Sequence, residues 1–222
     1  MCAGEFHPSR PEQPREFALP EAYPTMQILY PFAGPVAEYF TQLDNPDRYR
    51  PDQCPQCQAK QPLTAHGFYT RTLIDSAFDG CIRVRRYLCE VCRRTVSLLP
   101  EFALPYLRSS VTVIALFLMA RLFLGKTLKE ALLPAAPYQR GQSWVRRFRA
   151  HAESLSAALS ALIPPPPAPD FVARALTMLH TTGWIPAHRF LFAGLRHHLL
   201  GWPGSLIPDG RRVTIPPAAT TG

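Results

Sequence analysis

The alternation of apolar and polar residues predicts a β-hairpin in the middle of the chain. Residues 63–75 are rich in aromatic and β-branched side chains, and residues 81–88 alternate between apolar and basic ones. A period of two is typical of strands with one buried face. Between the two runs, Asp79-Gly80 is a dipeptide that favours a type I′ turn, because both residues tolerate positive φ. We therefore expect the hairpin to reverse at Asp79 and Gly80.

Shorter elements are predicted on both sides of this hairpin. Residues 27–32 could form a strand, and a helix is expected to begin at Pro35 and to end at Asn45-Pro46-Asp47. Residues 95–99 are apolar enough for a last strand, and residues 100–105 form a connector. Together these elements predict a small β domain over residues 25–105.

Helical periodicity replaces the strand pattern after residue 105. Ser109 or Ser110 is a plausible N-cap of a helix that ends near Gly125. Thr127-Leu-Lys-Glu130 has the sequence of a capping box, so a short helix is expected at 128–134. A longer helix is expected at 142–162. Its apolar stripe, at steps of three and four, comprises Trp144, Val145, Phe148, Ala152, Leu155, Leu159 and Leu162.

The long helix carries polar residues opposite its apolar stripe. Gln139, Gln142, Ser143 and Arg146 fall on that side at 100° per residue, and Arg147 and Arg149 flank the stripe. Arginine and glutamine can pair with guanine and adenine edges in a DNA groove. Three helices with a polar, basic last helix predict a helix-turn-helix over residues 106–163. An ordinary amphipathic surface helix is the alternative, and the 134–141 joint is longer than the usual turn.

The remainder of the chain is dominated by proline, of which there are 25 residues in 222. Residues 164–170 are expected to form a polyproline linker. Residues 171–202 are expected to hold one or two short helices with Trp184-Ile-Pro186 between them, and their histidines to be surface or core residues. Residues 1–24 and 203–222 are expected to be a disordered leader and tail.

Four cysteines occur as two closely spaced pairs, Cys54-Pro-Gln-Cys57 and Cys89-Glu-Val-Cys92. Two C-x-x-C motifs are the ligand set of a closed tetrahedral zinc site, which holds structure and leaves no open position for chemistry. The 31 residues between the pairs accommodate the hairpin, so the motif predicts a zinc ribbon with one structural Zn²⁺. A thioredoxin-type redox pair and secretory disulfides are less consistent with the sequence, because no suitable helix or signal peptide is present.

The charge distribution indicates a polyanionic partner. The formal net charge is +8, with 11 basic and 11 acidic residues in 1–100 but 13 basic and 5 acidic residues in 101–222. A basic region beside a ribbon is typical of nucleic-acid binding, although charge for solubility alone is an alternative. The apolar run 111–125 is too short to span a membrane, so we expect no membrane contact and a cytoplasmic protein.

Two segments resemble a known family: His66-Gly-Phe-Tyr-x-Arg71, and Arg85-Arg-Tyr87-x-Cys89-x-x-Cys92-Arg-Arg-Thr-Val-Ser97-Leu-Leu-Pro100. They are similar to the zinc ribbon at the front of bacterial insertion-sequence transposases, especially to a short transposase-related family, over about residues 25–162. The resemblance implies terminal-repeat or operator binding by a bacterial, nucleoid-associated protein. It also implies a zinc ion held by Cys54, Cys57, Cys89 and Cys92.

The sequence after residue 100 does not supply the carboxylates of a transposase nuclease, which needs three of them on a sheet. We therefore expect a non-enzymatic, α+β DNA-binding protein. Its double-stranded DNA contacts are expected from Arg83, Arg85, Arg86, Arg93 and Arg94 of the ribbon and from Gln142, Ser143, Arg146, Arg147 and Arg149 of the helix. A protein–protein adaptor, self-association or docking to a transposase, and a residual redox or nuclease activity remain alternatives.

Overall fold

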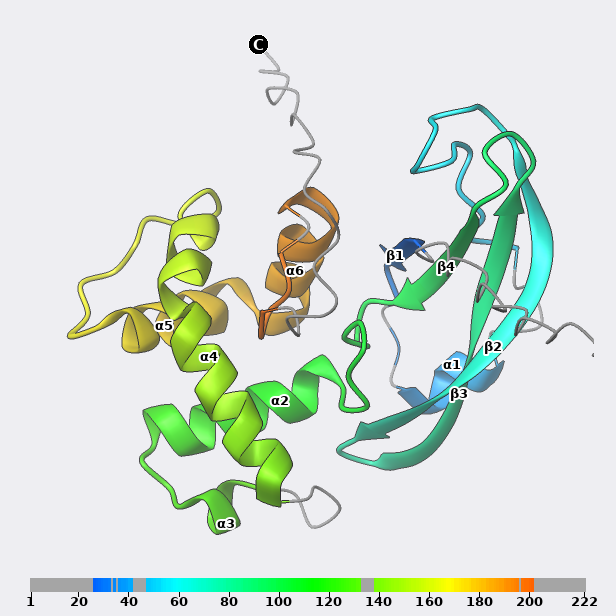
Figure 1. Cartoon of the computed structure of the whole chain (residues 1–222). Helices are drawn as coiled ribbons and strands as arrows, with labels where there is room; N and C mark the ends of the chain where they lie inside the picture. The colour runs from blue at the N-terminus through cyan, green and yellow to red at the C-terminus, as the bar shows by residue number, and fades with distance from the viewer. Residues whose placement is uncertain are drawn as a thin grey trace, which may run out of the picture.

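The fold is mixed α+β, with a four-stranded sheet on one side of the molecule and a group of helices on the other (Figure 1). It is known from a computed structural model that describes residues 26–32, 34, 36–41, 47–132, 138–195 and 197–201. The predicted disordered leader, residues 1–24, and tail, residues 203–222, lie outside the described residues.

The sheet has the strand order β1-β4-β3-β2. Strand β1 (Met26–Tyr30) pairs in parallel with β4 (Thr95–Pro100), which runs antiparallel to β3 (Phe78–Cys89). β3 is antiparallel to β2 (Leu63–Asp75), the long edge strand, and their pairing shifts register between Ala65 and Phe68. The predicted strands are therefore confirmed. Helix α1 (Val36–Thr41) follows β1, and its predicted end at Asn45-Pro46 lies outside the described residues.

The prediction of a turn at Asp79-Gly80 is wrong. Asp75 pairs with Phe78, so the hairpin reverses at residues 76 and 77, and Asp79 and Gly80 lie within β3. The observed register places Cys89 opposite Leu63, next to the first cysteine pair. A turn at 79–80 would have displaced Cys89 along β2 by several residues and separated the two pairs. The tertiary requirement therefore overrides the local preference of the dipeptide.

Two short helical elements follow the sheet at the predicted places. α2 (Val111–Leu118) begins after Ser110, whose hydroxyl accepts a hydrogen bond from the N–H of Val113 at 3.1 Å. It continues as the π-helical turn η2 (Met119–Phe123) and ends before Gly125, which has a positive φ of 70°. The predicted capping box is present, since Thr127 and Glu130 bond reciprocally at the start of α3 (Leu128–Ala131).

The long helix α4 runs from Tyr138 to Leu159, beginning four residues earlier and ending three residues earlier than expected. Trp144, Phe148, Ala152, Leu155 and Leu159 are buried as predicted. Leu162 lies beyond the helix and is 39% exposed, so its assignment to the apolar stripe was wrong.

Glycine at position 141 allows α4 to approach its neighbours closely. A Cβ on Gly141 would lie 2.9 Å from Cδ2 of Leu132 and 3.0 Å from Cζ of Phe117. Both distances are shorter than ordinary van der Waals contacts. Gly141 therefore fixes how the start of α4 packs against α2 and against the end of α3.

The helices after the proline segment belong to the same core as α2 and α4. They are α5 (Phe171–Thr182), α6 (Trp184–Arg189) and the π-helical turn η3 (Phe190–Gly194). Trp184 to Pro186 form the first turn of α6 rather than a break, and Gly183, with φ of 85°, separates the two helices. In Figure 1, α5 lies beside α4, and α6 contacts α2 and α5, whereas the turn η3 that follows it contacts β1.

Backbone hydrogen bonds join the hairpin tip to the start of the helical region. The N–H of Ile74 bonds to the carbonyl of Arg108, and the N–H of Ser110 bonds to the carbonyl of Ile74. The guanidinium of Arg71 donates to the carbonyls of Leu104 and Leu107. Sheet and helices are therefore joined by direct contacts. Among the described residues, no helix combines the length and apolar character needed to cross a membrane.

Candidate metal centre and nucleic-acid interface

The four predicted cysteine ligands converge at one point. The Sγ atoms of Cys54 and Cys92 are 3.8 Å apart, those of Cys57 and Cys89 are 3.7 Å apart, and all four lie within 4.8 Å of one another. A tetrahedron with metal–sulfur bonds of about 2.3 Å has edges of about 3.8 Å. The four sulfurs can therefore surround one metal ion with no further ligand.

The two cysteine turns have the same backbone hydrogen bonds. In the first, the N–H of Gln58 bonds to the carbonyl of Cys54 at 2.8 Å, and the N–H of Cys54 bonds to the carbonyl of Ala59 at 3.0 Å. In the second, the N–H of Arg93 bonds to the carbonyl of Cys89, and the N–H of Cys89 to that of Arg94, both at 2.9 Å. Gln58 and Arg93, each directly after a C-x-x-C, have positive φ values of 60° and 57°. Each pair is thus held by an equivalent tight turn.

The protein environment acts differently on the individual sulfurs: burial raises the pKa of Cys54, and it raises the pKa of Cys92 to about 12, whereas Cys89 is shifted the other way. Burial alone would raise the pKa of Cys89, but the backbone N–H groups of Cys92 and Val91 lower it to about 7. The Cys92 N–H lies 3.5 Å from the Cys89 sulfur, and the Gln56 N–H lies 3.4 Å from the Cys54 sulfur. Such N–H groups stabilise negative charge on sulfur. Four converging cysteine sulfurs match a metal that prefers thiolate ligands, and a bound cation would itself favour their ionised form.

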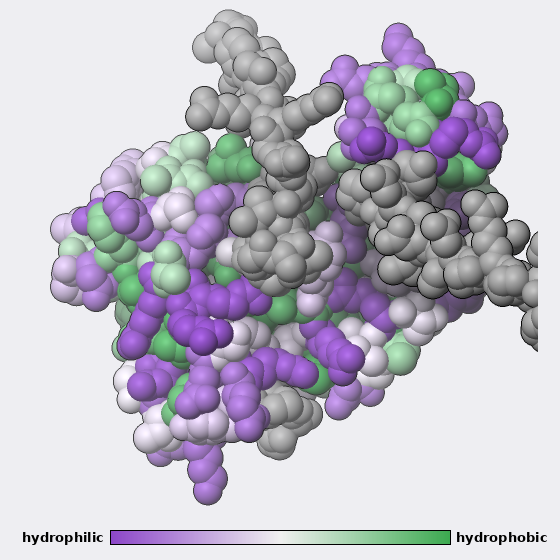
Figure 2. Space-filling model, viewed as in Figure 1, coloured by the Kyte–Doolittle hydropathy of each residue, from purple (hydrophilic) through white to green (hydrophobic). Residues whose placement is uncertain are grey.

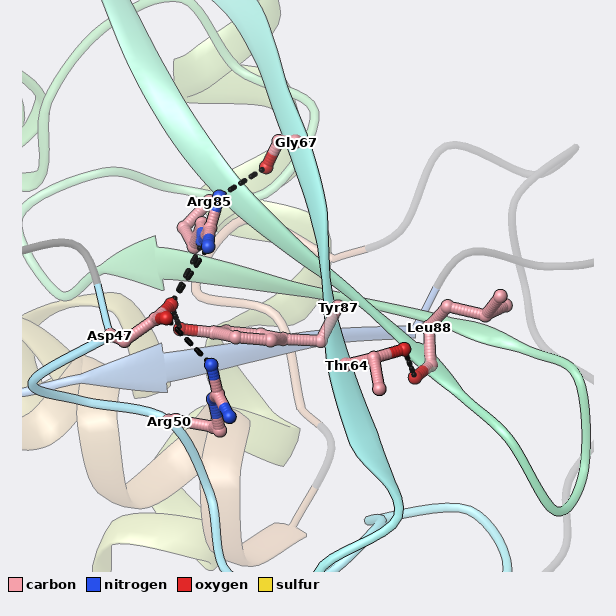
Figure 3. Close-up of polar contacts among 7 residues, drawn as sticks. All are labelled: Asp47, Arg50, Thr64, Gly67, Arg85, Tyr87 and Leu88. Carbon is pink, nitrogen blue, oxygen red and sulfur yellow. Dashed lines mark hydrogen bonds and ion pairs between the residues drawn. The ribbon is translucent and has the colours of Figure 1, made fainter.

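Asp47 anchors the segment before the first cysteine pair to the ribbon (Figure 3). Its carboxylate accepts hydrogen bonds from Arg85 at 2.8 Å, from the hydroxyl of Tyr87 at 2.9 Å, and from Arg50 at 2.6 Å. Partial burial raises the pKa of Asp47, but these three donors outweigh it and leave the pKa below its usual value. The network fixes the segment beside β3, where the cysteine turns require it.

Arg85 therefore has an intramolecular role that the sequence did not reveal. Its side chain is only 13% exposed, it forms an ion pair with Asp47, and its guanidinium also bonds to the carbonyl of Gly67. We assign Arg85 to the support of the metal centre rather than to a surface contact.

The other predicted ribbon arginines lie on different surfaces. Arg83 is exposed, on the face of β3 that also carries Arg85, and its guanidinium lies 4.2 Å from the ring centroid of Phe68. Arg86 points to the opposite face, since side chains alternate along a strand. Arg93 and Arg94 belong to the second cysteine turn, where Arg93 is exposed and Arg94 is half-buried. The five arginines do not form one continuous patch.

The polar stripe of α4 is exposed over the first half of the helix. Gln139, Gln142, Arg146 and Arg149 are exposed, opposite the buried residues, whereas Ser143 is half-buried at the side. Figure 2 shows hydrophilic side chains gathered on the face that includes α3 and the start of α4. The stripe thus presents amide and guanidinium groups to the surroundings along about three turns.

Arg147 does not share this surface. Its Nε donates to the carbonyl of Leu200 at 2.9 Å, and its Nη2 donates to the carbonyl of Gly201. Partial burial lowers its pKa without removing its charge under ordinary conditions. Arg147 therefore holds the end of the described chain against α4, which makes it unsuitable as a groove contact.

Several residues that support these sites were not identified from the sequence. Asp47 was interpreted only as part of a helix end, and Glu101 and Arg71 had no assigned role. Their partners are distant in the chain, as with Arg71 and the carbonyl of Leu104. An isolated acidic or basic residue in a sequence gives no indication of such a pairing.

Comparison with known proteins identifies one related domain. The profile of a family described as a domain of unknown function (DUF6431) matches residues 54–130, which include both cysteine pairs, the hairpin, α2 and the start of α3. No curated protein and no solved structure matches the chain. The matched segment ends before α4, so the basic helix lies outside this similarity.

Proposed function

We propose that this chain is a DNA-binding protein whose β domain is stabilised by one Zn²⁺ ion and whose helix α4 enters the major groove. The exposed stripe of α4 carries the proposal. Gln142, Arg146 and Arg149 are exposed on the side opposite to the buried core residues. Glutamine and arginine are the side chains that pair bidentately with adenine and guanine in that groove.

The arrangement of α2, α3 and α4 supports this assignment. α3 and α2 both contact α4, so the three helices pack as one unit, and the polar N-terminal half of α4 is exposed. In a helix-turn-helix, the last helix reads bases and the preceding helix crosses the backbone. The resemblance of the ribbon to transposase N-terminal regions is consistent with a terminal repeat or an operator as the target.

Zinc is the metal that the four sulfurs favour. A closed site with four thiolates suits Zn²⁺, and such a site contributes directly to folding. In this proposal the ion has no catalytic role. It holds the two cysteine turns together, so that the hairpin and the attached helices keep their positions.

Binding to a library of random duplexes, read by sequencing of the retained fraction, tests the proposed function. We expect a defined sequence preference and a logarithm of the binding constant that falls linearly with the logarithm of salt concentration. In the variant Arg146→Ala, the free-energy difference between the preferred base pair and the other base pairs should fall by about 1–3 kcal/mol at about one position of the site.

The control for this variant is Lys60→Ala, which also removes one exposed positive charge but lies beside the first cysteine turn. It should leave the sequence preference of the parent chain intact. Absence of duplex binding by the parent chain at low salt would refute the proposed function.

A hydrophobic surface on the helical side supports a second candidate function, protein–protein adaptor. Phe123, Leu124 and Phe171 are 57%, 63% and 44% exposed. Beside them is a hollow of about 520 Å³, lined by Leu122, Phe123, Arg149, Asp170, Val172, Ala173 and Leu176. Exposed apolar residues around a hollow are typical of protein interaction sites. Copurification of a partner that Phe123→Ser abolishes, without nucleic acid, would favour this candidate.

A further inference from the structure

The hairpin extends beyond the sheet as a two-stranded ribbon. Strand β4 pairs only with residues 85–88 of β3, whereas β2 and β3 remain paired down to Asp75 and Phe78. In Figure 1 this extension runs past α1, and its tip is directed towards α2. A ribbon of two strands is one of the two protein elements that the major groove of B-DNA, about 12 Å wide, can admit.

The two faces of this ribbon differ sharply. On the inner face, Leu73, Ile82 and Val84 are fully buried, in a core that also includes residues of α1. On the outer face, Thr70 pairs with Arg83 and Thr72 pairs with Cys81, and all four residues are exposed. The outer face therefore offers two hydroxyl groups and a guanidinium on a surface backed by a packed core.

The spacing of these side chains matches the spacing of base pairs. Residues two apart on a strand, such as Thr70 and Thr72, are separated by about 6.8 Å. Base pairs rise by about 3.4 Å along each DNA strand, so this separation corresponds to two steps. Threonine can bond to a base edge or contact the thymine methyl group, and arginine can bond to both acceptors of guanine.

Arg83 is oriented before any ligand binds. Its guanidinium lies 4.2 Å from the centroid of the Phe68 ring, and its carbonyl accepts a hydrogen bond from the hydroxyl of Tyr39 at 2.5 Å. Stacking engages the flat side of the guanidinium and leaves its N–H groups available at the edge. Of the charged neighbours on this face, Arg85 is paired with Asp47, and Asp79 lies near the hairpin turn.

We propose that the outer face of the β2–β3 ribbon reads base edges in the major groove of DNA, with Arg83 as its specificity-determining residue. This inference rests on the proposed DNA-binding function and adds a second reading element to α4. It assigns to Arg83, Thr70 and Thr72 direct contacts with bases, where a phosphate contact would carry no sequence information.

The charge-conserving variant Arg83→Lys tests this inference, with the full-length, zinc-loaded chain and the same random-duplex selection. Lysine keeps the positive charge but loses the planar fork that recognises guanine. We expect the variant to lose discrimination at one base pair by about 5- to 150-fold, while the slope of affinity against salt stays unchanged. Arg48→Lys, at another exposed arginine that is not among the expected DNA contacts, is the matched control and should leave the sequence preference intact.

A second variant, Thr70→Ala with Thr72→Ala, should relax preference at base pairs next to the one read by Arg83. Unchanged thermal unfolding of both variants would show that the ribbon still folds. The inference is overturned if Arg83→Lys and the threonine variant retain the full sequence preference of the parent chain, or if they weaken binding to all sequences alike. The ribbon then does not read bases, although α4 can still bind DNA. If the parent chain binds no duplex, the proposed function and this inference both fail.

Discussion

Arg189 lies with its Nε atom 2.6 Å from Oε2 of Glu101, so that helix α6 is joined by an ion pair to the turn that follows β4. The other carboxylate oxygen of Glu101 accepts a hydrogen bond from the N–H of Phe32 at 3.3 Å. One buried carboxylate therefore contacts the segment after β1, the end of the sheet and a helix near the end of the chain. Ile185 of α6 packs against both the helical core and the core beneath the sheet.

Removal of the arginine from this pair should destabilise the whole protein. Glu101 has a side-chain exposure of 6%, and Arg189→Met would leave its carboxylate without its charged partner. We expect a loss of about 1–3 kcal/mol in the free energy of unfolding, measured by urea denaturation. Arg146→Met, at an exposed position on α4, is the control and should change stability by less than about 0.5 kcal/mol. Equal stability of the two variants would contradict the role given to the Glu101–Arg189 pair.

The hairpin shows which parts of the fold a sequence can predict. Alternation identified the strands, because burial of one face imposes a period of two on residues such as Ile82 and Val84. The position of the turn was not predictable from the same information. It depends on the register that places Cys89 opposite Leu63, beside cysteines more than thirty residues away. Local turn preferences are weak compared with that requirement.

The candidate site was predictable to a similar extent. The cysteine spacing predicted the convergence of the four sulfurs, because two tight turns impose it. The roles of Arg85 and Arg147 were not predictable from the helix and strand patterns. Arg85 is paired with Asp47, 38 residues away, and Arg147 with the carbonyl of Leu200, 53 residues away. Contacts of this separation depend on the complete fold.

If the four cysteines hold Zn²⁺ as proposed, loss of one of them should release the ion and unfold the β domain around it. Cys57→Ser replaces an exposed sulfur of the quartet, so that a direct effect on core packing is small. We expect the purified variant to contain much less than one zinc per chain and to lose protection of the β2–β3 amide hydrogens. Elemental analysis and hydrogen exchange measure these quantities. Cys81→Ser, an exposed cysteine outside the quartet, should retain one zinc, and zinc loss there would contradict the assignment.

The Asp47 carboxylate should stabilise the fold, because it accepts hydrogen bonds from the side chains of Arg85, Tyr87 and Arg50. Asp47→Ala would leave the buried hydroxyl of Tyr87 and the guanidinium of Arg85 without this acceptor. Unsatisfied groups of this kind cost about 1–3 kcal/mol each when fully buried, and somewhat less here because the site is partly exposed. Thermal unfolding at neutral pH measures the loss. Asp52→Ala, at an exposed residue of the same segment, should have little effect, and a similar loss there would indicate a general effect of charge.

Acidification should destabilise the helical region through buried histidines. Burial lowers the pKa of His188 to about 4, whereas an unfolded histidine has a pKa near 6.5. Below pH 6.5 the unfolded chain binds a proton that the folded chain does not, so stability falls until the pH reaches about 4. At pH 5 this amounts to about 2 kcal/mol for His188. His188→Met has no ionisable group at this position. The free energy of unfolding of the variant, relative to that of the parent, should therefore rise by about 2 kcal/mol between pH 7 and pH 5.

Leu191→Met provides the control for this experiment, since it changes a buried residue of the same region, removes no ionisable group and should leave the pH dependence of the parent unchanged. Both measurements are differences between chains with the same four cysteines, so acid-induced loss of metal affects variant and parent alike. A His188→Met variant with the same pH dependence as the parent would show that His188 is accessible to protons in the folded state.

The helices after the proline segment should be indispensable to the helical core, although they lie outside the segment that matches the family profile. Leu176, Leu179 and Leu191 are at most 1% exposed and pack with residues of α2 and α4. Burial of each large apolar side chain contributes about 1.5–3 kcal/mol, so the combined loss approaches the total stability of a typical domain, about 5–15 kcal/mol. We therefore expect a chain that ends at residue 163 to bind an apolar dye and to lose cooperative unfolding of its helices.

The same shortened chain should still bind one zinc, because the cysteine turns have a separate small core that includes Leu63, Tyr87 and Val96. Zinc content therefore distinguishes loss of the helical core from failure of the whole chain to fold. A chain that ends at residue 201 keeps the contacts of Arg147 with the carbonyls of Leu200 and Gly201, so its helices should unfold cooperatively. Cooperative unfolding of the chain that ends at 163, at the same temperature as the parent, would show that α2 and α4 form a stable core without α5 and α6.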